Sequence, residues 1–234
     1  MNIPSLDKLS DPSSIVPLGD QAVLVYFADE PSTIAFAASV RSAKFHWLFD
    51  VVAAYSSVGI FFDAEATSFS EVVEDLRKVV ISHSSVAQQG CIHLIPCCYE
   101  RQLDLARVAE QTGLSADEII LRHHERDYTV HAIGFAPGFP YLGYLDSELC
   151  GVPRLSSPRL SVEPGSVGLT GKQTGIYPLA RPGGWNLIGR TPLTIVDVED
   201  GYFPIQVGDR VKFERIDETQ FNQMSGERLP VLGR

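Results

Sequence analysis

Apolar residues in the first part of the chain follow first a strand-like and then a helix-like spacing. Ala22–Phe27 reads AVLVYF and predicts a buried strand, and Phe49–Tyr55 followed by Val58–Phe62 predicts a hairpin. Pro31 stands where a first helical turn accepts proline, and the apolar face after it predicts a helix that ends near Ala43.

A second helix is predicted after Ser68. This serine and Glu71 have the spacing of a capping box, in which each side chain accepts a backbone N–H left free at a helix start. Cys91–Cys97 (CIHLIPC) then returns to a strand pattern. The order strand, helix, strand, strand, helix, strand predicts a ferredoxin-like α/β sandwich over residues 1–97.

Two more helical patterns follow, Leu103–Gln111 and Ser115–His124. The second opens with another capping box, and its last residues, His123 and His124, have the position at which imidazolium favours the helix dipole. We expect residues 98–127 to form a helical connection between two domains.

The second domain is predicted at residues 128–234. Tyr128–Ile133 alternates like a strand and enters a stretch, residues 133–193, that holds eleven glycines and eight prolines and no helical period. Many short strands at such spacing indicate a closed or nearly closed barrel. The strand candidates, each bounded by Gly, Pro or Asp, are Ser166–Thr170, Gly175–Leu179, Asn186–Gly189, Thr194–Asp197 and Arg210–Glu214. The fold class is therefore α+β.

Composition narrows the function. The hydrophobic share of 44% and the charged share of 21% are ordinary for a globular protein, and the formal net charge of −10 argues against general nucleic-acid binding. The N-terminus lacks a signal-peptide pattern, and no apolar run is long enough to span a membrane. Four cysteines are too few for a disulfide scaffold of this size, so we expect a cytoplasmic protein.

The Gly/Pro stretch has a positive net charge, whereas the whole chain has a negative one. Five cations face three carboxylates there, so the local field is expected to be positive and to favour an anionic or carbonyl-bearing ligand. The cations are Arg154, Arg159, Lys172, Arg181 and Arg190.

No metal site is expected. Cys91, His93 and Cys97 share one strand face, but the two cysteines would lie about 20 Å apart by strand rise, too far to share one ion. Gly168–Gly175 (GLTGKQTG) has the wrong spacing for a phosphate loop. It still offers backbone N–H groups, an ammonium and an amide that could clamp an anion or a lactam.

Candidate site residues come from this stretch and the strand before it. The candidate catalytic residues are His131, Asp146, Lys172 and Gln173; the candidate substrate ligands are Arg159, Thr174, Arg181 and Arg190; and the candidate partner contacts are Phe135, Phe139 and Trp185. Some of these candidates have a structural alternative. His131 could be a hydrogen-bonded core histidine, Asp146 could cap a turn, and each arginine could make turn contacts at the surface.

The Gly/Pro stretch also carries a family resemblance. GFAPGFPYLGYLD, PRLSSPRLSVEPGSVGLTGKQTGIYPL and PGGWNLIGRTPL, in that order, resemble the signature of the allophanate hydrolase subunit 1 family. Ile15–Phe27 and Ile205–Phe213 resemble the family's opening and ending more loosely. Cys97–Leu105 reads CCYERQLDL where relatives usually carry a glycine-rich segment.

This resemblance implies both a fold and an activity. It implies a cyclophilin-like barrel and the B subunit of an ATP-dependent 5-oxoprolinase, which opens the lactam of 5-oxoproline to glutamate. The resemblance further implies companion subunits of the A and C types, and ATP with Mg²⁺ used in the complex. Lys172 and Arg190 would then stabilise developing negative charge. Two alternatives are a KipI-like inhibitor of a sensor histidine kinase and a carboxyltransferase-type component of urea or allophanate metabolism.

Overall fold

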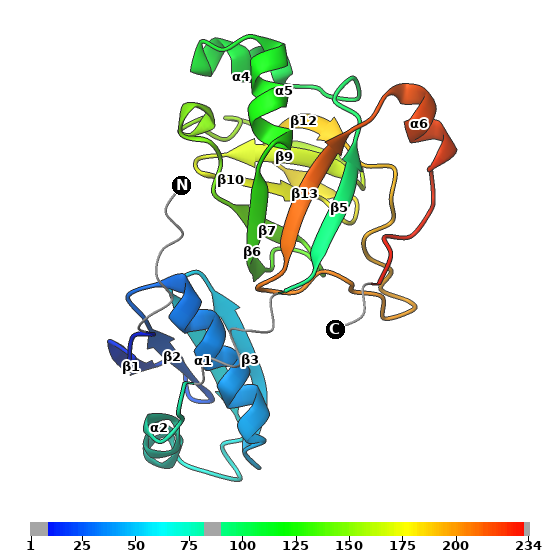
Figure 1. The fold of residues 1–234 in the computed structure, drawn as a ribbon. Coiled ribbons are helices and arrows are strands. Elements are labelled where there is room, and N and C mark those ends of the chain that lie inside the picture. The colour runs from blue at the N-terminus through cyan, green and yellow to red at the C-terminus, as the bar shows by residue number, and fades with distance from the viewer. Residues whose placement is uncertain (1–8, 82–89, 232–234) are drawn as a thin grey trace. The chain divides into compact units, whose positions relative to one another are not determined.

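The computed structural model describes residues 9–81 and 90–231 of the chain (Figure 1). The chain forms two compact units, Met1–Gln89 and Gly90–Arg234. Each unit contains its own principal sheet, with four strands in the first and seven in the second. None of the helices in the described ranges is long and apolar enough to cross a membrane.

The first unit is an antiparallel sheet, in the order β1-β2-β4-β3, with helices α1 and α2. The predicted capping box at Ser68 is confirmed, because its hydroxyl accepts the Glu71 N–H and the Glu71 carboxylate accepts the Ser68 N–H. Helix α1 buries Phe36 and Val40 and packs along β3 and β4. The bounds are β1 Ser14–Pro17, β2 Ala22–Tyr26, α1 Glu30–Ala43, β3 Leu48–Ala54, β4 Ser57–Phe62 and α2 Phe69–Arg77.

The strand expected to complete this sheet belongs to the second unit. Strand β5 (Ile92–Cys97) pairs in parallel with β13 (Arg210–Arg215) over its whole length. Strand β1 occupies the edge position beside β2. The expected ferredoxin-like arrangement is therefore not formed with Cys91–Cys97, because a short apolar run specifies a strand but not the strand that it pairs with.

The second unit is a barrel-like sheet in the order β12-β9-β10-β7-β6-β13-β5. Its two edge strands approach each other where Cys98 and Arg190 exchange backbone hydrogen bonds of 2.8 and 3.0 Å, so the barrel is nearly closed as predicted. A separate ribbon is formed by β8 and β11. The bounds are β6 Asp127–Ile133, β7 Pro140–Gly143, β8 Arg159–Val162, β9 Ser166–Thr170, β10 Gln173–Ile176, β11 Arg181–Gly183 and β12 Asn186–Arg190.

Helices α4 (Leu105–Thr112) and α5 (Ala116–His124) lie over one end of the barrel (Figure 1). Their buried residues, Leu105, Val108 and Ile119 among them, join the core cluster formed by the inward side chains of the strands. The segment that we expected to connect two domains is thus part of the second unit. It packs there because both helices have an apolar face that needs cover.

Two smaller expectations in this unit also need correction, and two short helices lie where the sequence pattern predicted none. The segment 194–197 makes only isolated bridges rather than a strand, and β10 begins two residues earlier than predicted. The weakly patterned tail contains helix α6 (Glu218–Gln223), which opens with a capping box formed by Asp217 and Gln220. A short 3₁₀ helix, η1 (Ser147–Leu149), interrupts the Gly/Pro stretch.

Candidate functional site

The outer face of the barrel at β6, β7 and β10 brings together residues from distant parts of the sequence. Gly143, at the end of β7, pairs with Thr129 of β6 on one side and with Gln173 of β10 on the other. Residues directly opposite each other in an antiparallel pair project to the same face. The side chain of Gln173 therefore lies on the face toward which Gly143 would carry its Cβ.

His131 occupies that same face. It stands where the β6–β7 register shifts between Val130 and Ala132, and its ring is buried. A Cβ on Gly143 would lie 2.8 Å from Cδ2 and 3.1 Å from Nε2 of His131, so the imidazole rests directly on the glycine. The ring of Tyr144 also packs against the His131 ring, with centroids 5.1 Å apart, and remains 43% exposed. Only glycine at position 143 leaves room for this ring.

Lys172 lies beside this cluster, in the tight turn between β9 and β10. Gly171 has φ +57°, as the turn requires, and the Lys172 side chain is exposed. Two of the four candidate catalytic residues, His131 and Gln173, thus share one face at Gly143. Lys172 adjoins them through the backbone, since it precedes Gln173 and its carbonyl accepts from the Leu145 N–H. We call these three residues, with Tyr144, the histidine cluster.

The turn is not built as a phosphate cradle. The Gly171 N–H donates to the carbonyl of Val152, the Lys172 carbonyl accepts from Leu145, and the turn joins two strands rather than a strand and a helix. Among residues 9–81 and 90–231, no group of three or more His, Cys, Asp or Glu side chains is placed to hold a metal ion.

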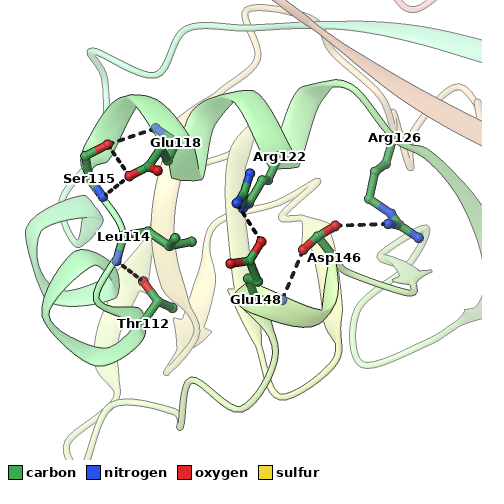
Figure 2. A network of polar contacts seen from close by, with 8 residues as sticks. All are labelled: Thr112, Leu114, Ser115, Glu118, Arg122, Arg126, Asp146 and Glu148. Carbon is green, nitrogen blue, oxygen red and sulfur yellow. Dashed lines mark hydrogen bonds and ion pairs between the residues drawn. The ribbon is translucent and has the colours of Figure 1, made fainter.

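Asp146 is engaged in a different network (Figure 2). One carboxylate oxygen accepts the Glu148 N–H at 3.0 Å, and the other contacts Arg126 at 3.3 Å. Arg122 of α5 forms an ion pair with Glu148 at 2.5 Å. These contacts fasten η1 to α5, so the turn-cap alternative accounts for Asp146.

Thr174 points into the barrel and is fully buried. Its hydroxyl donates to the Gly168 carbonyl at 3.0 Å, so the 2.9 Å contact with His123 requires Nε2–H of His123 to donate. Nδ1 of His123 then accepts from the Tyr99 hydroxyl at 2.7 Å. Burial lowers the His123 pKa to about 3, so the ring is neutral rather than a charged helix cap. Thr174 serves this internal network and is not accessible to a substrate.

Two of the three candidate arginines form ion pairs with carboxylates of this chain, and the third is exposed. Arg190 donates to the Pro164 carbonyl and forms an ion pair with Glu163. Arg159 donates to the buried carboxylate of Asp104 at 2.7 Å. Asp104, which lies in the segment that departs from the family pattern, also accepts the Leu187 N–H at 2.7 Å. Arg181 is exposed on β11.

Aromatic side chains form a second cluster on the outer face, beside Tyr141. Phe139 lies at its centre, with ring centroids 5.0 to 5.4 Å from Phe135, Tyr141, Tyr177 and Trp185. Phe139 and Trp185 are buried within this aromatic cluster, so they are not exposed anchors for a partner. Phe135 is 61% exposed and adopts φ +67°, a left-handed conformation that costs a non-glycine residue free energy.

Sequence reasoning missed Gly143, Tyr144 and Tyr177 as parts of these sites. All three lie inside the quoted motifs, but their roles depend on which strands pair. For Gly143 and Tyr144 the sequence signal was the run YLGYL (residues 141–145), in which a glycine stands between large side chains.

Comparisons with known proteins agree with the motifs. The family described as carboxyltransferase domain, subdomain C and D, matches residues 13–202. The chain is 35% identical to the 5-oxoprolinase B subunit of Bacillus subtilis (strain 168), covering 90% of this chain and 95% of that protein. It is 38% identical to the 5-oxoprolinase B subunit of Haemophilus influenzae (strain ATCC 51907 / DSM 11121 / KW20 / Rd), covering 86% of this chain and 96% of that one.

A solved structure also resembles the chain. The crystal structure of TTHA0988 superposes with a TM-score of 0.74 at 31% identity and covers 84% of this chain. The present chain spans 40% of the length of TTHA0988. The match over residues 13–202 and the two nearly full-length relatives lead to one conclusion: the chain belongs to the carboxyltransferase domain family, subdomain C and D, whose members include 5-oxoprolinase B subunits.

Proposed function

We propose that this chain is the B subunit of an ATP-dependent 5-oxoprolinase, a cytoplasmic complex that opens the lactam of 5-oxoproline to give glutamate. The observation that carries the proposal is the 35% identity to a 5-oxoprolinase B subunit over nearly the whole of both chains. The chain would act only with companion subunits of the A and C types. ATP with Mg²⁺ would supply the free energy for lactam opening, bound by the complex rather than by the Gly171–Lys172 turn.

The histidine cluster is the part of this chain proposed to act on the lactam. The imidazole of His131 is proposed as the acid–base group, because its two ring nitrogens can donate and accept hydrogen bonds and so pass a proton to or from water or the lactam nitrogen. The amide of Gln173 can bind the lactam group by hydrogen bonds. The exposed ammonium of Lys172 can stabilise negative charge that develops on the carbonyl oxygen.

The function is tested by reconstitution. The chain is co-expressed with its candidate partner subunits, and ATP-dependent release of glutamate from 5-oxoproline is measured with each subunit omitted in turn. We expect release to require this chain. An assembled complex that releases no glutamate contradicts the proposal, and the chain would then be tested for inhibition of sensor-kinase autophosphorylation.

The role of His131 is tested in the same complex. His131→Gln should lower kcat by about 10² to 10⁴-fold, the usual contribution of a positioned acid–base group. His124→Gln, which removes a half-buried histidine of α5, is the matched control and should leave kcat unchanged. Gly143→Ala should also lower kcat, because its methyl group would displace the imidazole. Full activity of His131→Gln would exclude the proposed role.

A further inference from the structure

Cations gather where the β8–β11 ribbon lies beside the aromatic cluster. Arg159 pairs with Gly183 across the ribbon, so its side chain lies on the face toward which Gly183 would carry a Cβ. That Cβ would lie 2.4 Å from the Tyr177 hydroxyl oxygen. Arg159 and the Tyr177 hydroxyl therefore lie on the same side of the ribbon.

Two further arginines, Arg154 and Arg181, lie near Gly183 in the structure. Arg181 lies on β11, two residues before Gly183. Arg154 directly precedes Leu155, whose N–H donates to the Gly184 carbonyl at 2.7 Å and holds this segment against the ribbon. Arg154 and Arg181 are both exposed, and neither forms an ion pair with any residue in the described ranges.

The charges of Arg154 and Arg159 reach the aromatic cluster. Burial raises the pKa of the Tyr177 phenol, and the Trp185 N–H, Arg154 and Arg159 act in the opposite direction. Arg159 is compensated by Asp104. The positive field at the surface therefore comes from Arg154 and Arg181, in a chain whose formal net charge is −10.

An exposed aromatic ring completes the surface. Phe135 stands edge-to-face to Tyr177, with ring centroids 6.2 Å apart, and is 61% exposed. An apolar wall next to two uncompensated guanidinium groups suits a small organic molecule that carries an oxyanion. Guanidinium groups bind carboxylate and phosphate through paired hydrogen bonds.

We propose that Arg154 and Arg181, beside the exposed ring of Phe135, form an anion-binding site that receives the carboxylate or phosphate group of a substrate of the complex. This inference rests on the proposed function for the identity of the two candidate ligands, 5-oxoproline and ATP. It extends that function by placing oxyanion recognition at the ribbon rather than at the histidine cluster.

The test uses Arg154→Gln, Arg181→Gln and the double variant in the reconstituted complex, with assembly checked by size-exclusion chromatography. Arg77→Gln in α2 is the control, because it removes the same charge from an exposed position of the first unit. Loss of a charge-assisted hydrogen bond should raise a KM about tenfold or more with little change in kcat. A raised KM for 5-oxoproline identifies the carboxylate as the ligand, and a raised KM for ATP identifies a phosphate. Unchanged values for both, in an active complex, overturn the inference.

A direct binding measurement separates failure of the site from failure of the proposed function. L-5-oxoproline and ATP are each titrated into the full chain and into the assembled complex by calorimetry. Binding that the double variant loses and Arg77→Gln keeps supports the site even in a complex without 5-oxoprolinase activity. If neither ligand binds the wild-type protein in either form, or if the double variant binds as tightly as wild type, the site is refuted.

Discussion

The buried His123 makes the stability of the barrel unit depend on pH in a direction fixed by its environment. Its pKa is lowered from 6.5 to about 3, so between these values the unfolded chain binds a proton that the folded chain does not. The stabilisation is present above pH 6.5 and is lost as the pH falls toward 3. Each unit of pKa difference corresponds to about 1.4 kcal/mol, and integration from pH 7 to pH 5 gives a loss of about 2 kcal/mol from this residue alone.

Urea unfolding at pH 7 and pH 5 measures this loss. In a Trp47→Phe background, the fluorescence of Trp185 reports on the barrel unit alone. Wild type and His124→Gln, the neighbouring control, should lose about 2 kcal/mol more between the two pH values than His123→Asn does. Equal losses in all three proteins, or an NMR titration that shows His123 protonating near pH 6.5 in the folded state, would refute the assigned burial and hydrogen bonding.

Three further predictions concern the packing around the candidate sites. Asp104→Asn should lower the free energy of unfolding by about 1 to 3 kcal/mol in a urea titration, because the buried carboxylate's contact with the Arg159 guanidinium is weakened. Asp127→Asn, which affects an exposed ion pair, should change the free energy of unfolding by no more than about 0.5 kcal/mol in the same titration. Gly165→Ala should destabilise by at least about 2 kcal/mol in thermal unfolding, because φ is +82° and a backbone carbonyl oxygen would lie 2.4 Å from the new Cβ; an unchanged Tm would contradict that geometry. Cys97, whose pKa is raised by burial, should stay unmodified by a thiol reagent while half-buried Cys150 reacts, as read by mass spectrometry of the native protein; early labelling of Cys97 would contradict its burial.

Local signals in the sequence predicted local structure well. The capping boxes at Ser68 and Ser115 form both of their reciprocal hydrogen bonds, and the run from Phe49 to Phe62 forms the expected hairpin. Such signals succeed because the interacting groups lie within a few residues of one another. Partner choice between strands depends on distant groups, and for that reason the strand at Cys91–Cys97 was given to the wrong sheet.

Strand boundaries and register, which local signals do not fix, also explain why the Gly168–Gly175 segment differs from the expected clamp. Treated as a loop, it was expected to present Lys172, Gln173 and Thr174 together as one clamp. The turn contains only Gly171 and Lys172, and β10 starts at Gln173, so successive side chains alternate between the two faces of the sheet. Gln173 therefore lies outside near His131, and Thr174 lies inside near His123. An error of two residues in the start of a strand was enough to assign a core residue to the site.

The expected excess of positive charge in the Gly/Pro stretch depends only on the numbers of cations and carboxylates. It is therefore less sensitive to strand register than the assignment of individual site residues. The Gly/Pro stretch has two more cations than carboxylates. In the folded chain Asp146 and Glu148 are satisfied by arginines of α5 and the turn after it, outside the stretch, while Glu163 is satisfied by Arg190. Arg159 is paired with Asp104. The cations of the stretch that form no ion pair within the described ranges are Arg154, Lys172 and Arg181. They fall at two places, at or beside the ribbon (Arg154 and Arg181) and at the histidine cluster (Lys172). Under the proposed function, ATP and 5-oxoproline would each bring negative charge to the complex, so positive groups at two places would serve two ligands.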